Sequence, residues 1–422
     1  MPVFLDIPLI LDRLCYRYPS LLLDTVVEHD PGTRMVAVKN VTVNEEYFQG
    51  HFPGTPLMPA VMMIESLAQV ATLLLLSDSG PGGVESHVRV ILQGVNGAKF
   101  RRQVLPGDQL RLEVVVRERS TESAVVRALA TTDGRMVAEA DLLIGFQSPP
   151  VEVHETAVVD PRARLGHGTV VGPHVVVGPD VILGKRCRVG PSAVIDGCTE
   201  LGDDCQVFPF ASIGLIPQDL KFKGEETRLV IGERNVFREG VTINRGTRGG
   251  GGLTQISDDN VFMAYVHVAH DCVIGDRNIF GPGATLGGHV VIEDDATVSA
   301  YSGVQQYCRV GRQAFIGGYS AVTKDALPYG RTVGNRARLF DLNTIGLMRR
   351  QCPLETIARL RRAYRYLLQS KLNTTQALDR IQSDATLSCS EVDYLLEFIR
   401  GSKRGVSLHR RPRRMEPIGV DE

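Results

Sequence analysis

A chain of 422 residues is longer than one ordinary core requires, so two or three domains are expected. Its 43% hydrophobic and 23% charged residues are typical of a globular protein in water. The net charge of −1 gives no reason to expect a nucleic-acid partner, and the one basic run, at 409–414, is interpreted as a solvated terminus.

The start of the chain, MPVFLDIPLILDRL, lacks the basic region and the small-residue cleavage site of a secretory signal. None of the eight cysteines forms a CxxC pair, and we expect free thiols in a reducing cytoplasm rather than disulfides. The longest apolar run, 56–77, carries Glu65 and Gln69 near its middle. We therefore expect a buried core helix there and no insertion into a membrane.

The composition changes along the chain and predicts five parts. Residues 1–147 alternate strand-like runs with turns around one long apolar helix, which predicts an α+β domain. A proline pair marks a linker at 148–153, and a repeat of six residues fills 154–328. Helical spacing in PLETIARLRRAYRYLLQ and SEVDYLLEFIRG predicts a small α-helical domain at 329–405, before a basic tail at 406–422.

One segment of the α+β domain combines a histidine with an acid. In NEEYFQGHFPGTPLMPAVMMIESLAQ (44–69), His51 lies in a glycine-bounded turn and Glu65 lies two turns into the helix. A carboxylate on an apolar helix is costly unless it has a partner or a reaction to serve. Such a pair suits β-elimination of water, because one group takes the α-proton and the other protonates the leaving hydroxyl. The helix N-terminus at Ala60–Val61 offers N–H groups that could polarise a thioester carbonyl.

This segment, together with RYPSLLLD (17–24) and RRQVLPGDQL (101–110), resembles the (3R)-3-hydroxyacyl-carrier-protein dehydratases of hotdog fold. The resemblance implies a dimer in which His51 and Glu65 from opposite subunits form the catalytic pair. Tyr16 stands where the family often has histidine, and Ala60 replaces a usual glycine.

The repeat places an aliphatic residue or phenylalanine at every sixth position, and Gly or Asp usually follows. A period of six fits neither a helix nor a hairpin, but it fits a parallel β-helix of triangular coils with eighteen residues per turn. Loops at 215–228 and 245–253 interrupt the repeat and are functional candidates. The twenty-five inward positions are Val159, Leu165, Val171, Val177, Leu183, Val189, Ile195, Leu201, Val207, Ile213, Ile231, Phe237, Ile243, Ile256, Phe262, Val268, Ile274, Phe280, Leu286, Ile292, Val298, Val304, Val310, Ile316 and Val322.

The repeat also assigns positions to the histidines of FMAYVHVAHDCVIG. Since Val268 points inward, His270 begins the next face, His289 lies one coil above it, and Arg245 lies roughly below it. We expect these residues to cluster on the outside of the prism, beside a glycine-rich loop. Three interpretations compete: surface histidines, a zinc site formed by His267, His270 and His289, or a general base. We favour the general base, in which His270 deprotonates a hydroxyl and Asp271 or a neighbour fixes its tautomer.

Four segments, PQDLKFKGEETRLVIG, TINRGTRGGGGLT, FMAYVHVAHDCVIG and TLGGHVVIEDDA, are similar to the cytoplasmic UDP-N-acetylglucosamine O-acyltransferases that open lipid A synthesis. The resemblance covers about 152–405. It implies a left-handed parallel β-helix and a homotrimer with its site between subunits. The implied reaction transfers a (3R)-3-hydroxyacyl group from acyl carrier protein to the sugar 3-hydroxyl.

The same resemblance implies roles for individual residues. His270 would be the general base, and Gly318 would end the acyl pocket and leave room for a long chain. Gln305 and Asn244 stand where histidine is expected, and neither can carry a positive charge against a diphosphate. The residues expected to bind substrate are Asp219, Lys221, Arg245, His267, Asp271, His289, Gln306, Gly318, Asn343 and Arg349.

Together the two resemblances predict a bifunctional enzyme whose halves use the same 3-hydroxyacyl thioester. Neither reaction requires a metal or an organic cofactor, since acyl carrier protein brings its own phosphopantetheine arm. The basic stretch KFRR (99–102) is a candidate docking point for this acidic carrier. A trimeric prism with a dimeric hotdog suggests a homotrimer or a hexamer. Two alternatives remain: a hotdog domain that only binds the carrier or serves assembly, and a transferase for another nucleotide sugar or an amine.

Overall fold

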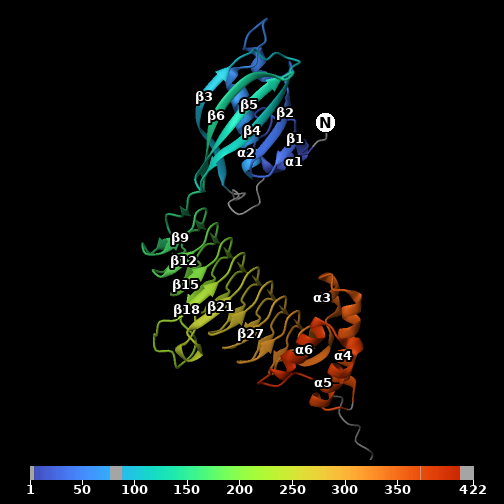
Figure 1. Cartoon of the computed structure of the whole chain (residues 1–422). Coiled ribbons are helices and arrows are strands. Elements are labelled where there is room, and N and C mark those ends of the chain that lie inside the picture. The colour runs from blue at the N-terminus through green and yellow to red at the C-terminus, as the bar shows by residue number, and fades with distance from the viewer. Residues whose placement is uncertain (1–3, 77–87, 371, 409–422) are drawn as a thin grey trace, which may run out of the picture. The chain divides into compact units, whose positions relative to one another are not determined.

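The computed structural model describes residues 4–76, 88–370 and 372–408, so the basic run at 409–414 lies outside the described residues (Figure 1). The chain divides into two compact units, Met1–Pro149 and Pro150–Glu422. We call them unit 1 and unit 2. The division falls within the proline-containing segment 148–153.

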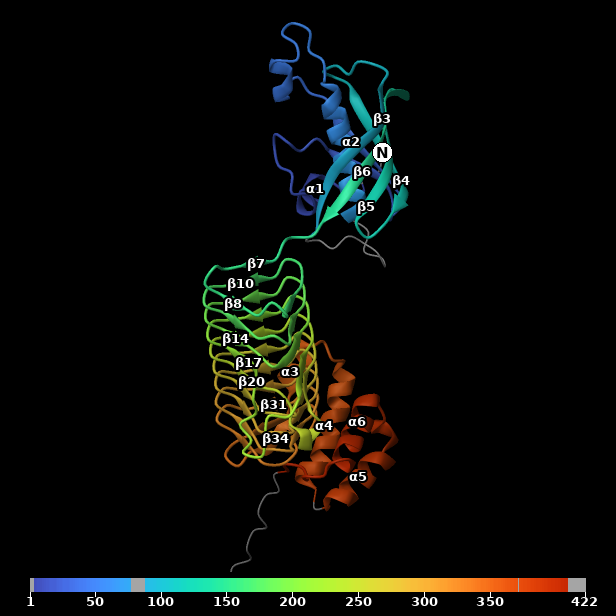
Figure 2. The same ribbon diagram turned by 90° about the vertical axis from the view of Figure 1, so that its left-hand side faces the viewer.

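Unit 1 is an antiparallel six-stranded sheet packed around one long helix. The strand order is β1-β2-β4-β5-β6-β3, so β1 and β3 form the edges. Helix α2 packs against β2, β3, β4, β5 and β6, and Figure 2 shows it beside the sheet. The expected α+β hotdog fold is therefore confirmed. The elements are α1 (Ile7–Arg13), β1 (Thr25–Asp30), β2 (Arg34–Asn40), η1 (Glu46–Gln49), α2 (Ala60–Leu76), β3 (Arg89–Phe100), β4 (Gln109–Arg119), β5 (Ser123–Thr132) and β6 (Arg135–Gln147).

The sequence of α2 explains both its helical form and its burial. It begins directly after Pro59 and contains neither Gly nor Pro, which are the strongest helix breakers. Leu67, Leu73 and Leu74 are completely buried, and burial of one such side chain contributes roughly 1.5–3 kcal/mol. In the described part of the chain, no helix is long and apolar enough to cross a membrane.

Unit 2 begins with a prism of three parallel sheets, as the repeat predicts. The first sheet contains β7 (Glu152–Val153), β10 (Val170–Val171), β13 (Arg188–Val189), β16 (Gln206–Val207), β19 (Val236–Phe237), β22 (Val261–Phe262), β25 (Ile279–Phe280), β28 (Thr297–Val298), β31 (Phe315–Ile316), β33 (Gly330–Val333) and the antiparallel β34 (Arg338–Leu342). The second contains β8 (Val158–Val159), β11 (Val176–Val177), β14 (Val194–Ile195), β17 (Ser212–Leu215), β20 (Thr242–Asn244), β23 (His267–Val268), β26 (Thr285–Leu286), β29 (Gly303–Val304) and β32 (Ala321–Val322). The third contains β9 (Arg164–Leu165), β12 (Val181–Leu183), β15 (Cys198–Leu201), β18 (Arg228–Ile231), β21 (Leu253–Ile256), β24 (Val273–Ile274), β27 (Val291–Ile292) and β30 (Arg309–Val310).

From β7 to β32, strand partners lie eighteen residues apart wherever no loop intervenes, as for Val176 and Val194. All the inward positions from Val171 to Val322 are buried, while the two in the first coil are partly buried. Large side chains stack along the axis: the rings of Phe237 and Phe262 lie 5.0 Å apart, and those of Phe262 and Phe280 lie 4.7 Å apart. The predicted inward positions of the prism are therefore confirmed.

A ladder of buried asparagines holds successive coils together. Asn235, Asn260 and Asn278 are completely buried at equivalent positions of three coils. The side-chain oxygen of Asn235 accepts the backbone N–H of Asn260 at 2.9 Å, and that of Asn260 accepts the backbone N–H of Asn278 at 2.8 Å. Each asparagine thus satisfies a backbone donor of the next coil, which would otherwise be buried without a partner.

The C-terminal helices belong to the same unit as the prism. The expected helix segments are confirmed, and β33 and β34 continue the first sheet beyond the expected boundary at 328/329. Tyr394 on α6 donates its hydroxyl to Glu293 of the prism, and Arg309 lies over the ring of Phe398 at 4.0 Å. The helical elements are α3 (Thr344–Arg349), α4 (Leu354–Gln369), α5 (Thr374–Ser383), η3 (Ala385–Leu387) and α6 (Ser390–Arg400).

The asparagine ladder yields a stability prediction. Asn260→Ala removes the acceptor for the Asn278 N–H and leaves this buried donor unpaired, so unit 2 should lose about 2–4 kcal/mol of stability. Denaturant unfolding of the whole chain, followed through the transition of unit 2, measures the loss. Asn335→Ala, at an exposed asparagine of the same unit, is the control. Equal stability of the two variants would contradict a structural role for the ladder.

Candidate active site

The centre of the site in unit 2 is a buried pair of neighbouring residues, His270 and Asp271, in the turn between β23 and β24. Asp271 has a φ of 61°, in the left-handed region that aspartate tolerates better than most residues. This conformation brings its Oδ2 to 2.7 Å from His270 Nδ1. Since a carboxylate oxygen can only accept, Nδ1 carries the proton and Nε2 is left as the basic nitrogen.

The glycine-rich loop between β20 and β21 covers this pair. Its Thr247 donates a backbone N–H to Asp271 Oδ1 at 2.8 Å and its hydroxyl to Oδ2 at 2.6 Å. Thr254, on β21, accepts the backbone N–H of Asp271 at 2.8 Å. His270 and Asp271 lie at a corner of the prism and outside its apolar interior, but they are only 8% and 6% exposed, since the loop closes over them.

His289 lies beside the pair, one coil further along, as the repeat predicts. Its Nε2 is 3.7 Å from Asp271 Oδ2, and its ring meets that of His270 edge-on at 5.2 Å. The other face of His289 is stacked on Tyr307 at 4.4 Å. Burial lowers the pKa of His289, although the Asp271 carboxylate acts in the opposite direction.

His267 points to a different partner from His270. Its Nδ1 lies 2.8 Å from the Thr242 hydroxyl, on the neighbouring strand β20. Burial lowers the pKa of His267, and the charge of His270 lowers it further. One ligand atom from each of His270, Asp271 and His289 lies within 4.8 Å of the other two, and His267 is outside this group, unlike in the alternative interpretation of a zinc site. Because Asp271 already accepts three hydrogen bonds, we interpret the group as a hydrogen-bonded base.

The first interrupting loop, between β17 and β18, carries Asp219 and Lys221. The Asp219 carboxylate accepts the backbone N–H of Lys221 at 3.0 Å, and its charge raises the pKa of His289 against the stronger effect of burial. Asn244 donates its side-chain amide to the Ile216 carbonyl at 3.0 Å, which anchors the start of the loop. Asn244 therefore has a structural partner at the position where histidine was expected.

Arg245 is turned toward the first loop rather than placed simply beneath His270. Its guanidinium donates to the Gly214 carbonyl at 3.2 Å and lies 5.6 Å from the centre of the Phe222 ring. The side chain thus braces the base of this loop. No hydrogen bond joins it to His270 or His289 among the described residues.

Other predicted binding residues lie on different elements. Gln305 and Gln306 line a groove of about 780 Å³ with Arg336, on the face formed by β26, β29 and β32. Gly318 is exposed, and a Cβ atom there would lie 3.4 Å from the Ala300 carbonyl oxygen.

Asn343 and Arg349 lie at the two ends of α3. The Asn343 side chain caps this helix by accepting the Gly346 N–H, and its amide donates to the Gln313 carbonyl at 3.0 Å. These structural bonds were not foreseen for a residue expected to lie near the nucleotide. Arg349 is exposed.

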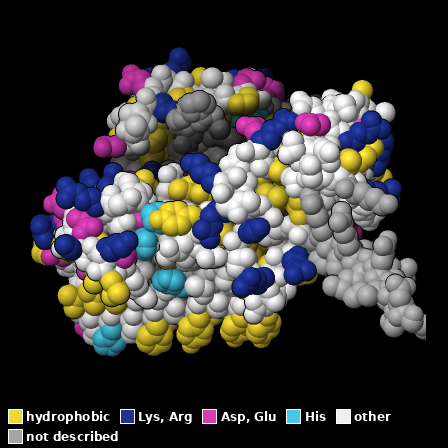
Figure 3. Space-filling view, turned by 90° about the horizontal axis from the view of Figure 1, so that it is seen from below, with side chains coloured by type: hydrophobic (Ala, Val, Ile, Leu, Met, Phe, Trp, Pro, Cys, Tyr) yellow, Lys and Arg dark blue, Asp and Glu magenta, His cyan; other side chains and the backbone are white. Residues whose placement is uncertain are grey.

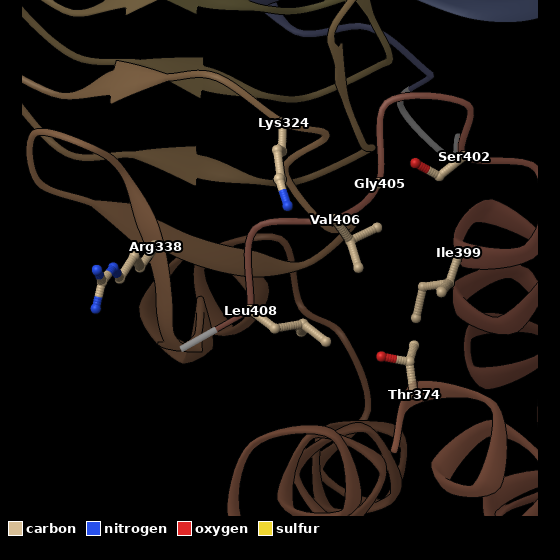
Figure 4. A pocket seen from close by; sticks show the side chains of 8 residues that line it. All are labelled: Lys324, Arg338, Thr374, Ile399, Ser402, Gly405, Val406 and Leu408. Carbon is tan, nitrogen blue, oxygen red and sulfur yellow. The ribbon is translucent and has the colours of Figure 1, made fainter. Parts of the chain in front are cut away.

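A separate hollow of about 630 Å³ lies where the prism meets the C-terminal helices, and Figure 4 shows its lining. Lys324 and Arg338 supply its charge, and Ile399 and Val406 supply apolar surface. None of the residues predicted to form the site lines it, so we do not assign it to the reaction.

Unit 1 holds the second predicted pair. His51 Nδ1 lies 2.7 Å from the Leu57 carbonyl, which can only accept, so Nε2 is again the basic nitrogen. Glu65 accepts the side-chain amide of Gln69 at 2.9 Å. Within the described residues, no hydrogen bond joins His51 to Glu65. The structure therefore does not join the predicted pair by a hydrogen bond within one chain.

Gln69 and Tyr16 were not foreseen as neighbours of Glu65. Gln69 is completely buried; its amide also donates to the Ser20 carbonyl at 2.8 Å, and its oxygen accepts the Leu22 N–H at 2.8 Å. Burial raises the pKa of Tyr16, and the Glu65 carboxylate raises it further. The spacing of four between Glu65 and Gln69 on one helix was the available signal for their contact.

Comparison with known families divides the chain in the same way. A family model described as a FabA-like domain matches residues 14–141. The bacterial transferase hexapeptide model, which spans six repeats, matches 162–197 and 253–288. The model of domain 2 of Udp N-acetylglucosamine O-acyltransferase matches 325–407.

Individual relatives match unit 2. The acyl-[acyl-carrier-protein]–UDP-N-acetylglucosamine O-acyltransferase of Thermodesulfovibrio yellowstonii is 43% identical over 255 residues, which are 60% of this chain and 98% of the relative. The enzyme of the same name from Myxococcus xanthus is 47% identical over 61% of this chain and 99% of its own length. Among solved structures, LpxA of Acinetobacter baumannii is 38% identical, with a TM-score of 0.59 over 61% of this chain and 99% of its own.

The partly buried His267 yields a prediction about pH. Because the pKa of His267 lies below 6.5 in the folded chain, the unfolded chain binds more protons as the pH falls through this range. The stability of unit 2 should therefore decrease as the pH falls below about 6.5, and His267→Gln should reduce this decrease. Thermal unfolding measured from about pH 5.5 to about pH 7.5, which is about one unit on either side of the ordinary histidine pKa, tests the effect. His154→Gln, at an exposed histidine, is the control, and identical pH dependence of His267→Gln and the unsubstituted chain would disprove the assignment.

Proposed function

Since the chain belongs to the UDP-N-acetylglucosamine O-acyltransferase family and carries a FabA-like domain ahead of the prism, we propose that it is bifunctional. Unit 2 transfers a 3-hydroxyacyl group from acyl carrier protein to the 3-hydroxyl of UDP-N-acetylglucosamine. Unit 1 dehydrates the same 3-hydroxyacyl thioester. The hydrogen bond from His270 Nδ1 to the buried Asp271 is the observation that carries the transferase proposal.

In the transfer reaction, Nε2 of His270 takes the proton of the sugar hydroxyl as its oxygen attacks the thioester carbonyl. The carbon–sulfur bond then breaks, and the proton leaves with the pantetheine thiol. The Asp271 carboxylate, 2.7 Å away, stabilises the imidazolium that forms between these steps. Glycine at position 288 permits this packing, because a Cβ atom there would lie 2.6 Å from His270 Cε1.

In the dehydration, Nε2 of His51 takes the α-proton, and the Glu65 carboxyl gives a proton to the leaving hydroxyl, which departs as water. The hydrogen bond from His51 Nδ1 to the Leu57 carbonyl supports the assignment of His51 as the base, because it leaves Nε2 unprotonated. Since each side chain has a different hydrogen-bond partner within one chain, we propose that the site pairs His51 of one subunit with Glu65 of a second.

Two apolar surfaces support a homo-oligomer. Strand β3 is a free sheet edge whose Ile91, Leu92, Val95 and Phe100 are exposed, which suits pairing with a second unit 1. One corner of the prism carries Phe210, Tyr265, Tyr301 and Tyr319, all between 60% and 74% exposed. Figure 3 shows hydrophobic side chains in a row along one edge of the molecule. We propose dimeric contacts through unit 1 and trimeric contacts through unit 2, which together give a hexamer.

An assay of the purified chain with 3-hydroxyacyl-acyl carrier protein tests both activities. We expect enoyl-carrier protein without UDP-N-acetylglucosamine and acylated sugar with it, separated by mass. Acylated sugar alone would show that unit 1 only binds the carrier or serves assembly. Enoyl product alone would show that unit 2 uses another acceptor.

Single substitutions should separate the two reactions. Glu65→Gln should lower dehydration by about 10²- to 10⁴-fold, as expected for a lost acid–base group, and leave transfer unchanged. His270→Ala should lower acyl transfer by a similar factor and leave dehydration unchanged. Steady-state rates of both reactions on each variant provide the measurement, and each unit serves as the folding control for the other. Loss of both activities in either variant would contradict two independent sites.

A further inference from the structure

The glycine-rich loop is built to reach the Asp271 carboxylate. Thr247 is 5% exposed and gives both its donors, the backbone N–H and the hydroxyl, to the two oxygens of Asp271. Thr247 is itself fixed, because its carbonyl accepts the N–H groups of Gly250 and Gly252 at 3.0 and 2.8 Å. The loop therefore holds the threonine, and the threonine holds the carboxylate.

Gly250 shows how closely the loop approaches. A Cβ atom at this position would lie 2.1 Å from the Asp271 carboxylate carbon, far inside any allowed contact. Only glycine lets the backbone lie against the carboxylate, because any side chain at this position would collide with it. A loop that served only to contact substrate would not need this approach to Asp271.

The hydroxyl of Thr247 and Nδ1 of His270 both donate to the same oxygen, Asp271 Oδ2, at 2.6 and 2.7 Å. Two donors on one oxygen fix the direction in which the carboxylate faces the imidazole. Positive charge develops on His270 during proton transfer, next to this oxygen. A carboxylate that is already oriented stabilises that charge without reorganisation, which is the condition for efficient electrostatic catalysis.

We propose that Thr247 is a positioning residue for acyl transfer, whose hydroxyl holds Asp271 in the orientation that supports His270 as the base. This inference rests on the proposed transferase function of unit 2. It assigns the glycine-rich loop a role that acts through Asp271 and not through contact with the substrate.

Thr247→Val removes the hydroxyl and keeps both the shape of the side chain and the backbone N–H. We expect kcat for acyl transfer to fall about ten- to hundredfold, which is the effect of one hydrogen bond to a charged group. The KM values for the nucleotide sugar and for the acyl carrier protein should stay within about twofold, since substrate binding is not altered. Thr247→Ser restores the hydroxyl and should recover most of kcat.

Thr169→Val is the matched control. Thr169 is a completely buried threonine of the prism whose hydroxyl donates to the Gly184 carbonyl at 2.8 Å, in a coil that carries none of the residues assigned to the site. We expect this variant to lose stability and to keep kcat. A fall of kcat in this control similar to that in Thr247→Val would attribute the effect to stability and overturn the positioning role.

The unsubstituted chain in the same assay separates the possible failures. If it transfers no acyl group, the proposed function of unit 2 fails, and the inference falls with it. If it is active and Thr247→Val keeps its kcat, only the positioning role is overturned. A rise in KM at unchanged kcat, or a serine variant as slow as the valine variant, would likewise overturn that role.

Discussion

The eighteen-residue coil is the constraint on which unit 2 depends. Three parallel sheets make each coil one turn of a prism, so a side chain at a corner meets the side chains eighteen residues before and after it. One corner thereby stacks Asp271, His289 and Tyr307, all with φ near 60°. At another corner, Arg277 donates a hydrogen bond to the Asp295 carboxylate in the next coil at 3.0 Å. Arg350, beside the C-terminal helices, donates to the same carboxylate at 2.9 Å. The repeat that builds the core therefore also determines which polar groups meet outside it.

This constraint explains how much of unit 2 follows from the sequence. The six-residue repeat predicts which residues point inward, how the coils stack, and that His270 and His289 are neighbours. All of these depend on a fixed period. Tyr307 could have been placed by the same count, since it lies eighteen residues after His289. The glycine-rich loop over His270 could not have been placed in this way, because Thr247 lies in that loop, which interrupts the six-residue repeat. Its path is set by hydrogen bonds within the loop, for which no spacing rule exists.

Unit 1 was predictable for a different reason. Its fold follows from one apolar helix and a set of alternating strands, and Glu65 is conspicuous because it is acidic on that helix. The sequence does not reveal that completely buried Gln69 joins Glu65 to the segment around Ser20 and Leu22. Such a bridge depends on the path of a segment almost fifty residues away, and helix periodicity carries no information about it.

His51 and His270 have the same hydrogen-bonding arrangement, but their partners differ in charge, and this difference suits the two proposed reactions. In each histidine, Nδ1 donates a hydrogen bond to an oxygen of the protein, which leaves Nε2 as the basic nitrogen. The partner of His51 is the neutral carbonyl of Leu57, which fixes the tautomer but carries no full charge to stabilise an imidazolium. The partner of His270 is the carboxylate of Asp271, whose side chain is completely buried. In the proposed dehydration, an acid supplied by the second subunit would balance the proton taken by His51. In acyl transfer, His270 must hold its proton until the thiol leaves, and a buried carboxylate beside it meets that requirement.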